Sequence, residues 1–142
     1  VLAAVEQLRV RWPDALVTDS RRTPAALRSH LATLGSAYHP WEACPPGWLA
    51  TTLARTETCW ITGDSVSMVY ESLTAGCATG LIELPAQARV TRVARGLEGL
   101  KTAGLVSTLD SLAATGEPPR PTHPALAEAD RVARFLLGQG HA

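Results

Sequence analysis

The chain has 142 residues, of which 46% are hydrophobic, and its 13 basic and 13 acidic side chains give a formal net charge of zero. This composition excludes a disordered or fibrous protein, and it provides no general positive field that would attract nucleic acid or an anionic membrane. The length and the apolar content together predict one domain with a substantial hydrophobic core.

A helix is predicted at the start of the chain, because hydrophobic residues recur at helical spacing and Pro13 ends the run. The residues that define this spacing are Val1, Val5, Leu8 and Trp12. No strand precedes this helix in the sequence.

A short apolar strand over residues 15–18 runs into the polar segment 19–24, DSRRTP. We expect Thr23 to cap the next helix and Pro24 to be its first residue. The buried face of that helix is predicted to contain Leu27, Leu31 and Leu34. Arg21 and Arg22 then lie at the mouth of a βα turn, where planar guanidinium groups can clamp a diphosphate. The alternative is a solvated pair of arginines at a helix start, matched to Asp19.

A weaker strand is predicted over residues 36–41, and a proline-rich loop and a short helix over residues 47–55 follow it. Trp41 and Trp48 lie in or beside this loop, either as packing residues or as a stacking surface for a base or a partner. His39 lies near the end of the weak strand, where a lone histidine is more often a surface or structural residue than a catalytic base.

Residues 58–85 form the central stretch of the sequence, because they predict a complete strand, turn, helix and strand. The first strand ends at Gly63, Asp64 or Ser65 can cap the helix, and Gly76 ends it. The helix face that is predicted to pack on a sheet contains Val66, Val69, Tyr70 and Leu73. A nearly continuous apolar run over residues 81–84 is typical of a strand that is covered on both faces.

Such a βαβ unit places residues 63–65 at the carboxyl end of a strand and at the amino end of a helix, where open α/β sheets bind anionic groups. Ser67 and Glu71 lie four residues apart, away from the apolar face, so both can point toward a ligand over the turn. The alternative is that both residues simply belong to the solvent-exposed polar face of an amphipathic helix. Asp64 is an objection, since its carboxylate would repel a diphosphate unless an arginine or a metal offset it.

A further helix is predicted over residues 86–103, with Arg89, Arg92 and Arg95 on one side. These arginines are either a solvated face or a contact to phosphate or to another domain. Residues 105–112 fit a short strand or a helical turn. Residues 116–124, GEPPRPTHP, predict a stiff connector, and residues 125–137 predict a C-terminal helix.

The alternation of strands and helices predicts an α/β fold, specifically a Rossmann-like three-layer domain with a mainly parallel sheet. Two segments in this pattern, SRRTP at residues 20–24 and GDSVSMVYE at residues 63–71, resemble signatures of the mitochondrial fission ELM-like family, including its bacterial members. The resemblance covers most of residues 1–137. The family is similar to the B-type (GT-B) glycosyltransferases, in which two Rossmann-like domains face each other and the C-terminal one holds a nucleotide-diphosphate sugar.

The resemblance implies that residues 1–142 are the C-terminal domain of such a protein, without its first strand and without the N-terminal domain. The first strand of a doubly wound sheet is central, so we expect another segment or a second copy of the chain to complete the sheet.

By the same resemblance, Glu71 would hold the ribose hydroxyls and the turn over residues 63–65 would meet the diphosphate. The predicted nucleotide-binding residues are Ser20, Arg21, Arg22, Thr23, Gly63, Asp64, Ser65, Ser67, Met68 and Glu71. No residue is identified as a catalytic base, which in B-type transferases commonly comes from the N-terminal domain, so this chain alone is not expected to be active.

The resemblance thus predicts a nucleotide-sugar-binding domain of a glycosyltransferase-like protein. The alternative is a non-catalytic interaction domain, as the fission role of the plant members suggests, which would bind a partner such as a dynamin-like GTPase.

Cys44, Cys59 and Cys77 are odd in number and have no Cys-x-x-Cys spacing. This pattern argues for a reducing compartment and against a disulfide framework or a zinc site. No apolar run approaches the about 20 residues that a membrane-spanning helix needs, and no signal peptide precedes the first helix. We therefore expect a soluble cytoplasmic protein without a metal or a cofactor. The family resemblance implies a nucleotide-diphosphate sugar as its substrate.

Overall fold

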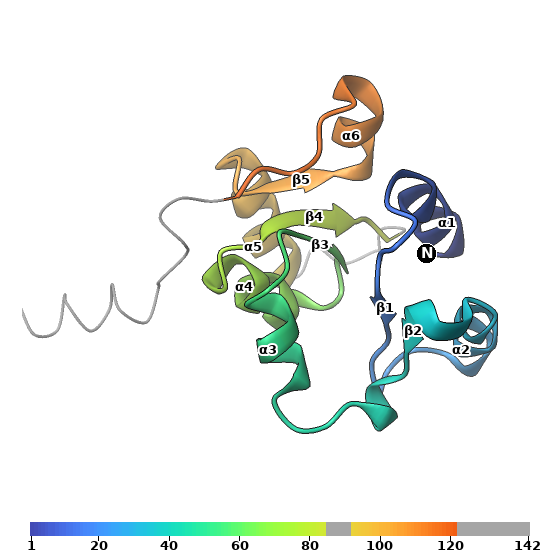
Figure 1. Ribbon diagram of the computed structural model, residues 1–142. Helices are drawn as coiled ribbons and strands as arrows, with labels where there is room; N and C mark the ends of the chain where they lie inside the picture. The colour runs from blue at the N-terminus through green and yellow to red at the C-terminus, as the bar shows by residue number, and fades with distance from the viewer. Residues whose placement is uncertain (85–91, 122–142) are drawn as a thin grey trace, which may run out of the picture. The chain divides into compact units, whose positions relative to one another are not determined.

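The computed structural model describes residues 1–84 and 92–121, which form alternating helices and parallel strands (Figure 1). The chain divides into two compact units, Val1–Thr51 and Thr52–Ala142. Each unit contains its own parallel sheet. The predicted α/β fold class is therefore confirmed, and the arrangement is consistent with a Rossmann-like domain.

The first unit is built on a two-stranded parallel sheet. Its elements are α1 (Leu2–Arg11), β1 (Val17–Thr18), α2 (Ala25–Ala32), β2 (Tyr38–His39) and 3₁₀ turns at Gly35–Ala37 and Trp41–Ala43. Val17 lies opposite Tyr38 and Thr18 lies opposite His39. The Thr18 hydroxyl also donates a hydrogen bond of 2.7 Å to the His39 carbonyl, which joins the two strands through a side chain.

The second unit is built on a three-stranded parallel sheet in the order β3-β4-β5. Its strands are β3 (Thr58–Thr62), β4 (Ala78–Ile82) and β5 (Val106–Thr108), and its helices are α4 (Val66–Thr74), α5 (Arg92–Thr102) and α6 (Leu109–Thr115). A further helix, α3 (Trp48–Leu53), leads from the first unit into the second. The helices and strands of this unit are labelled in Figure 1.

The core of the second unit forms where α4 and α5 pack on one face of this sheet. Val69 and Leu73 of α4 are completely buried, as the helical spacing predicted. They meet the inward side chains of Ile61 and Leu81, which lie opposite each other in β3 and β4. Leu100 of α5 and Val106 of β5 complete this cluster. Burial of these side chains is the main force that fixes the turn between β3 and α4.

Gly76 ends α4, as predicted. Its backbone has a φ of 85°, a left-handed conformation that glycine adopts at little cost. The N–H groups of Gly76 and Cys77 donate to the carbonyls of Leu73 and Ser72, at 3.1 and 3.0 Å. These bonds satisfy the last carbonyls of the helix and direct the chain into β4.

Several predicted boundaries were wrong. The N-cap of α2 is Pro24 rather than Thr23, because the Thr23 hydroxyl accepts a hydrogen bond from the Ser20 N–H and does not cap the helix. β4 begins at Ala78, earlier than the predicted strand over residues 81–84, and includes Gly80, which interrupts the apolar pattern. The weak strand over residues 36–41 shortens to Tyr38–His39. Residues 105–112 contain both a strand and the start of a helix.

Some predictions fall outside the described residues. These are the segment 86–91 with Arg89, the end of the connector over residues 122–124, and the C-terminal helix over residues 125–137. The described part of the connector, residues 116–121, contains no helix or strand.

Candidate functional site

The turn after β1 is closed by its own side chains and backbone. The Thr23 N–H donates to the Ser20 carbonyl at 2.9 Å, and the Ser20 N–H donates to the Thr23 hydroxyl at 3.0 Å. The Arg22 N–H lies 3.3 Å from the Ser20 hydroxyl, which accepts from it. Ser20 and Thr23, two of the predicted binding residues, therefore hold the shape of the turn with their side chains.

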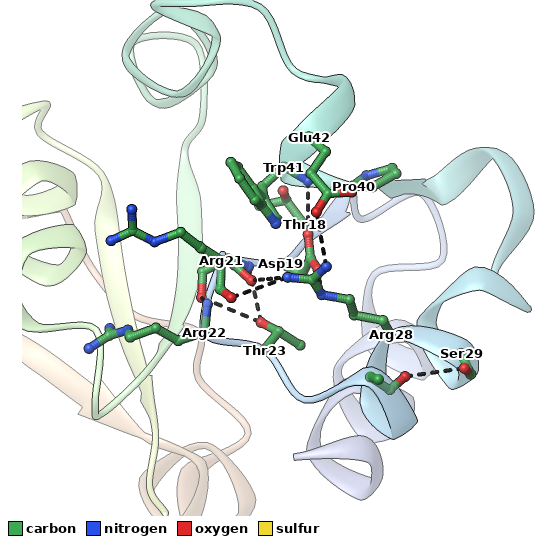
Figure 2. A network of polar contacts seen from close by, with 12 residues as sticks. Thr18, Asp19, Arg21, Arg22, Thr23, Arg28, Ser29, Pro40, Trp41 and Glu42 are labelled. Atoms are coloured by element: carbon green, nitrogen blue, oxygen red, sulfur yellow. Dashed lines mark hydrogen bonds and ion pairs between the residues drawn. The ribbon is translucent and has the colours of Figure 1, made fainter.

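Arg28, in the first half of α2, contacts this turn and stabilises it (Figure 2). We call the contacts of Arg28 with Asp19 and with the turn the brace. Its Nη2 donates to the carbonyls of Ser20 and Arg21, at 3.0 and 3.3 Å. Its Nη1 donates to Glu42 at 3.2 Å, and its Nε lies 3.0 Å from Asp19 Oδ2 in an ion pair. Neither Nε nor Oδ2 forms a regular hydrogen bond, so this last contact is mainly electrostatic.

Asp19 is the buried partner in this network, with only 1% of its side chain exposed. Its Oδ1 accepts the backbone N–H of Trp41 at 2.8 Å. Burial raises the pKa of the Tyr38 phenol, and a hydrogen bond to the Asp19 carboxylate raises that pKa further. One carboxylate thus connects the end of β1, the helix α2 and the segment that follows β2.

Arg21 and Arg22 have exposed side chains. Figure 2 shows both extending from the turn to the same side, while Arg28 approaches the turn from another side. The sequence offered Asp19 as a partner for these arginines, but Asp19 forms its ion pair with Arg28. The two guanidinium groups stand at the carboxyl end of a parallel strand, as the sequence predicted.

The turn after β3 is held mainly by backbone bonds. The Gly63 N–H donates to the Ile82 carbonyl at 3.0 Å, and the Ser65 N–H donates to the Thr62 carbonyl at 2.9 Å. Ser65 is buried and occupies the N-cap position of α4, but its side chain makes no capping hydrogen bond. The Asp64 side chain is exposed.

The first two turns of α4 display the remaining predicted residues. Ser67 and Glu71 are exposed and lie four residues apart, on the side away from the buried Val69 and Leu73. Met68 is half-buried and packs against the hydrophobic core. Ser67 and Glu71 are therefore accessible to a ligand, whereas Met68 mainly supports the helix.

The sequence model of the family described as "Mitochondrial fission ELM1" matches residues 1–139. The chain belongs to this family. The match covers both described units and both motif turns, SRRTP and GDSVSMVYE. No curated protein and no solved structure matches this ELM1-family chain.

Within this ELM1-family chain, the predicted residues fall into two groups. Ser20, Arg21, Arg22 and Thr23 lie together in the first unit, and the group from Gly63 to Glu71 lies in the second. His39, which was considered as a base, stacks on Trp48 with ring centroids 5.8 Å apart. This contact agrees with a packing role for both rings.

Asp19, Arg28 and Glu42 were not predicted as members of the site. Asp19 and Arg28 are nine residues apart and Glu42 lies fourteen residues beyond Arg28, so no helical or strand spacing connects the three. The only sequence signal was an arginine in the second turn of a short helix that follows a polar turn. Such a signal is common on solvated helix faces.

Three further findings concern the part of the chain that the structure describes. Across residues 1–84 and 92–121, no group of three or more His, Cys, Asp or Glu side chains could hold a metal ion. In the same described part, no helix is long and apolar enough to cross a membrane. All three cysteines are free.

One shallow cavity of about 190 Å³ lies in the second unit. It is lined by β5, α6 and the segment after α6, namely Gly104, Leu105, Val106, Ser107, Ser111, Thr115, Glu117, Pro118 and Arg120. It contains none of the predicted nucleotide-binding residues.

Proposed function

We propose that this chain is the nucleotide-diphosphate-sugar-binding domain of a glycosyltransferase-like (GT-B) protein. The observation that carries the proposal is the pair of exposed arginines on the braced turn after β1. Arginine offers a rigid fork of donors that matches two phosphate oxygens at once, and a diphosphate can engage both guanidinium groups.

Position in the fold supports the same ligand. Open α/β sheets bind ligands beyond the carboxyl ends of their strands, and both turns follow the carboxyl ends of parallel strands. The turn after β3 also begins α4, whose N-terminal N–H groups and dipole favour a negative charge. In the proposed complex, Glu71 accepts hydrogen bonds from ribose hydroxyls and Ser67 donates to one; both side chains are exposed on α4.

The strand order within each unit matches part of a doubly wound sheet. The classic doubly wound order is 3-2-1-4-5-6, in which strands 2 and 3 are neighbours and strands 4, 5 and 6 form a second run. The order β1-β2 in the first unit is that of such a pair, and the order β3-β4-β5 in the second unit is that of such a run. We propose that a segment outside residues 1–142, or a second copy of the chain, supplies strand 1 and the opposing domain.

The proposal has to account for the negative charge of Asp64. An exposed carboxylate beside a diphosphate is repulsive, with a Coulomb energy of about 1 kcal/mol at 4 Å in bulk water and more where water is excluded. In the proposed complex an arginine or a metal has to offset this charge. Replacement of Asp64 by Asn should therefore strengthen diphosphate binding slightly and leave base selectivity unchanged.

The family description favours a second candidate function. A family described by mitochondrial fission suggests a protein-interaction role, in which the same α/β surface binds a protein partner and no nucleotide. The two functions differ in one requirement, because only the transferase-like function needs nucleotide binding.

A calorimetric and thermal-shift titration with uridine, guanosine and adenosine diphosphates and their sugar derivatives tests the proposal. Ligand at 100 times its dissociation constant adds about 2.7 kcal/mol of stability, which shifts the melting temperature by several degrees. The opposing domain or second copy should be present, because part of the site is proposed to come from it.

Glu71→Ala should weaken nucleotide binding about tenfold or more, since hydrogen bonds to a charged group contribute about 1.5–3 kcal/mol. Glu57→Ala is the matched control, because Glu57 is an exposed carboxylate immediately before β3, at the opposite end of that strand. A base-selective shift lost only in Glu71→Ala supports the transferase-like function. Absence of any nucleotide binding in the completed protein would favour the interaction function.

A further inference from the structure

The network around Asp19 and Arg28 has a feature that a simple surface ion pair lacks. Asp19 is almost completely buried, while its partner Arg28 keeps 29% of its side chain exposed. Burial of a carboxylate is costly unless charges and donors surround it. Here the Trp41 N–H donates to Asp19 and the Arg28 guanidinium forms an ion pair with it, so its position is fixed by contacts from α2 and from the segment after β2.

Arg28 uses its guanidinium entirely within the first unit. Nε faces Asp19, Nη1 binds Glu42, and Nη2 binds the carbonyls of Ser20 and Arg21. It therefore has little capacity left for a ligand. Its contact with two successive backbone carbonyls sets the path of the chain at the exposed arginines.

The direction of these carbonyls matters for an anion. A carbonyl oxygen carries a partial negative charge, and two of them at the turn are directed to Arg28. Figure 2 shows the Arg21 and Arg22 side chains leaving the turn on another side. An anion that binds these arginines thus avoids the negative ends of the turn's own peptide groups.

We propose that Asp19 and Arg28 are positioning residues, which hold the turn over residues 20–23 so that Arg21 and Arg22 form a preorganised site for a diphosphate. This inference rests on the proposed function for its ligand, but the brace itself can be tested without any ligand. Preorganisation improves affinity because the ligand does not have to order the turn.

Asp19→Asn and Glu42→Gln are a matched pair of variants for the test. Each removes one negative charge from a partner of Arg28, but only Asp19 is buried and bound to the Trp41 N–H. Electrostatics alone predicts that either variant binds an anion more tightly, because a nearby negative charge is lost. If Asp19 instead positions the turn, Asp19→Asn should lower the affinity for the anion about tenfold. Glu42→Gln should change that affinity by no more than about twofold.

Arg28→Lys is the second variant, in case Asp19→Asn does not fold. Lysine keeps the positive charge beside Asp19, but its single ammonium group cannot reach Asp19, Glu42 and two carbonyls at once. We expect it to weaken anion binding by a similar factor. The probe is inorganic pyrophosphate, titrated by calorimetry at a temperature where each variant is folded.

Amide hydrogen exchange of Arg22 and Thr23 gives the readout without a ligand. Both amides donate within the turn, so loss of the brace should speed their exchange about tenfold or more in Asp19→Asn and Arg28→Lys. Glu42→Gln should leave it unchanged, and the amide of Ile61 in β3 should be unaffected in all three variants.

Unchanged exchange at Arg22 and Thr23 in both brace variants overturns the inference, whatever the affinity. Faster exchange with unchanged pyrophosphate affinity also overturns it, because the turn would then not need to be held for binding. If the intact protein binds neither pyrophosphate nor a nucleotide, the proposed function is wrong, and the exchange rates alone decide whether the brace holds the turn.

Discussion

The turns after β1 and β3 occupy equivalent places, each between a parallel strand and a helix, but different forces hold them. The first turn is held by side-chain hydrogen bonds and by an ion pair with a buried carboxylate. The second is held by backbone hydrogen bonds above a core in which Val69 and Leu73 are completely buried. A polar brace fixes a turn through a few residues, whereas a core fixes it through the whole strand–helix pair.

The two mechanisms suit the proposed roles of the turns. Two long arginine side chains need a rigid base, because each loses about 2 kcal/mol of rotamer entropy when it is immobilised. On a sheet of only two residues per strand, a polar brace supplies the rigidity that packing does not. Ser67 and Glu71 are already carried by a helix that the core fixes, so no comparable brace is needed.

The largest expected effect in the second unit follows from Leu73→Ala. Leu73 is fully buried between α4 and the sheet, so its truncation leaves a cavity and should cost about 2–5 kcal/mol of unfolding free energy. Urea denaturation followed by circular dichroism measures this loss. Thr74→Ala changes the next, exposed residue of α4 and should cost less than about 0.5 kcal/mol. Equal effects of the two variants would show that the core does not hold the second turn.

A pair of glycine variants separates the turn itself from the sheet below it. A Cβ atom on Gly80 would lie 2.3–2.6 Å from ring atoms of Trp60, which faces it across the β3–β4 register. Gly80→Ala should therefore destabilise the protein by about 1–3 kcal/mol, because the indole must move. A Cβ atom on Gly63 would meet its nearest neighbours at 3.8 Å, which is ordinary contact, so Gly63→Ala should be nearly neutral.

Thermal unfolding of both glycine variants and of the double variant Gly80→Ala, Trp60→Leu checks this prediction. Removal of the indole should recover most of the cost of Gly80→Ala, which a double-mutant cycle measures as coupling. If Gly63→Ala is the more damaging change, the second turn depends on its glycine and not on the sheet.

The second turn could be predicted from the sequence because its signals are local. Val69 and Leu73 lie at helical spacing, Gly63 follows β3, Gly76 follows α4, and all are within fourteen residues. The exposed positions of Ser67 and Glu71 follow from that spacing. β4 was the exception, since Gly80 breaks the apolar run and is explained only by the ring of Trp60 above it.

The brace of the first turn could not be predicted in the same way. The turn and its arginines were expected, but Thr23 was assigned to cap α2 when its hydroxyl closes the turn on Ser20. The partner of Asp19 is decided by how α2 folds back on β1, which brings Arg28 to the turn. Side chains that meet through tertiary contacts leave no periodic pattern, so a polar network is harder to predict than an apolar face.

The smallest expected effect is a pH dependence of the unfolding free energy that arises from Cys59 in β3. The pKa of the Cys59 thiol is raised from 9.0 to about 11, mainly by burial; the neighbouring Cys77 contributes to this increase, and a hydrogen bond from Ser72 opposes it. Between pH 9 and 11 the unfolded chain loses this proton while the folded chain keeps it. Stability from this group is thus fully present below about pH 9 and declines as the pH rises toward 11.

Cys59→Ala isolates this contribution, because the other groups that titrate at alkaline pH are the same in both proteins. The advantage of the wild type over Cys59→Ala in unfolding free energy should shrink by about 1–2 kcal/mol between pH 8 and pH 10.5, less than a full two-unit shift since the side chain is partly exposed. Urea denaturation at the two pH values, under reducing conditions, measures it. A constant difference between the proteins would mean that the thiol is solvated, and that the core under the second turn is looser than its packing indicates.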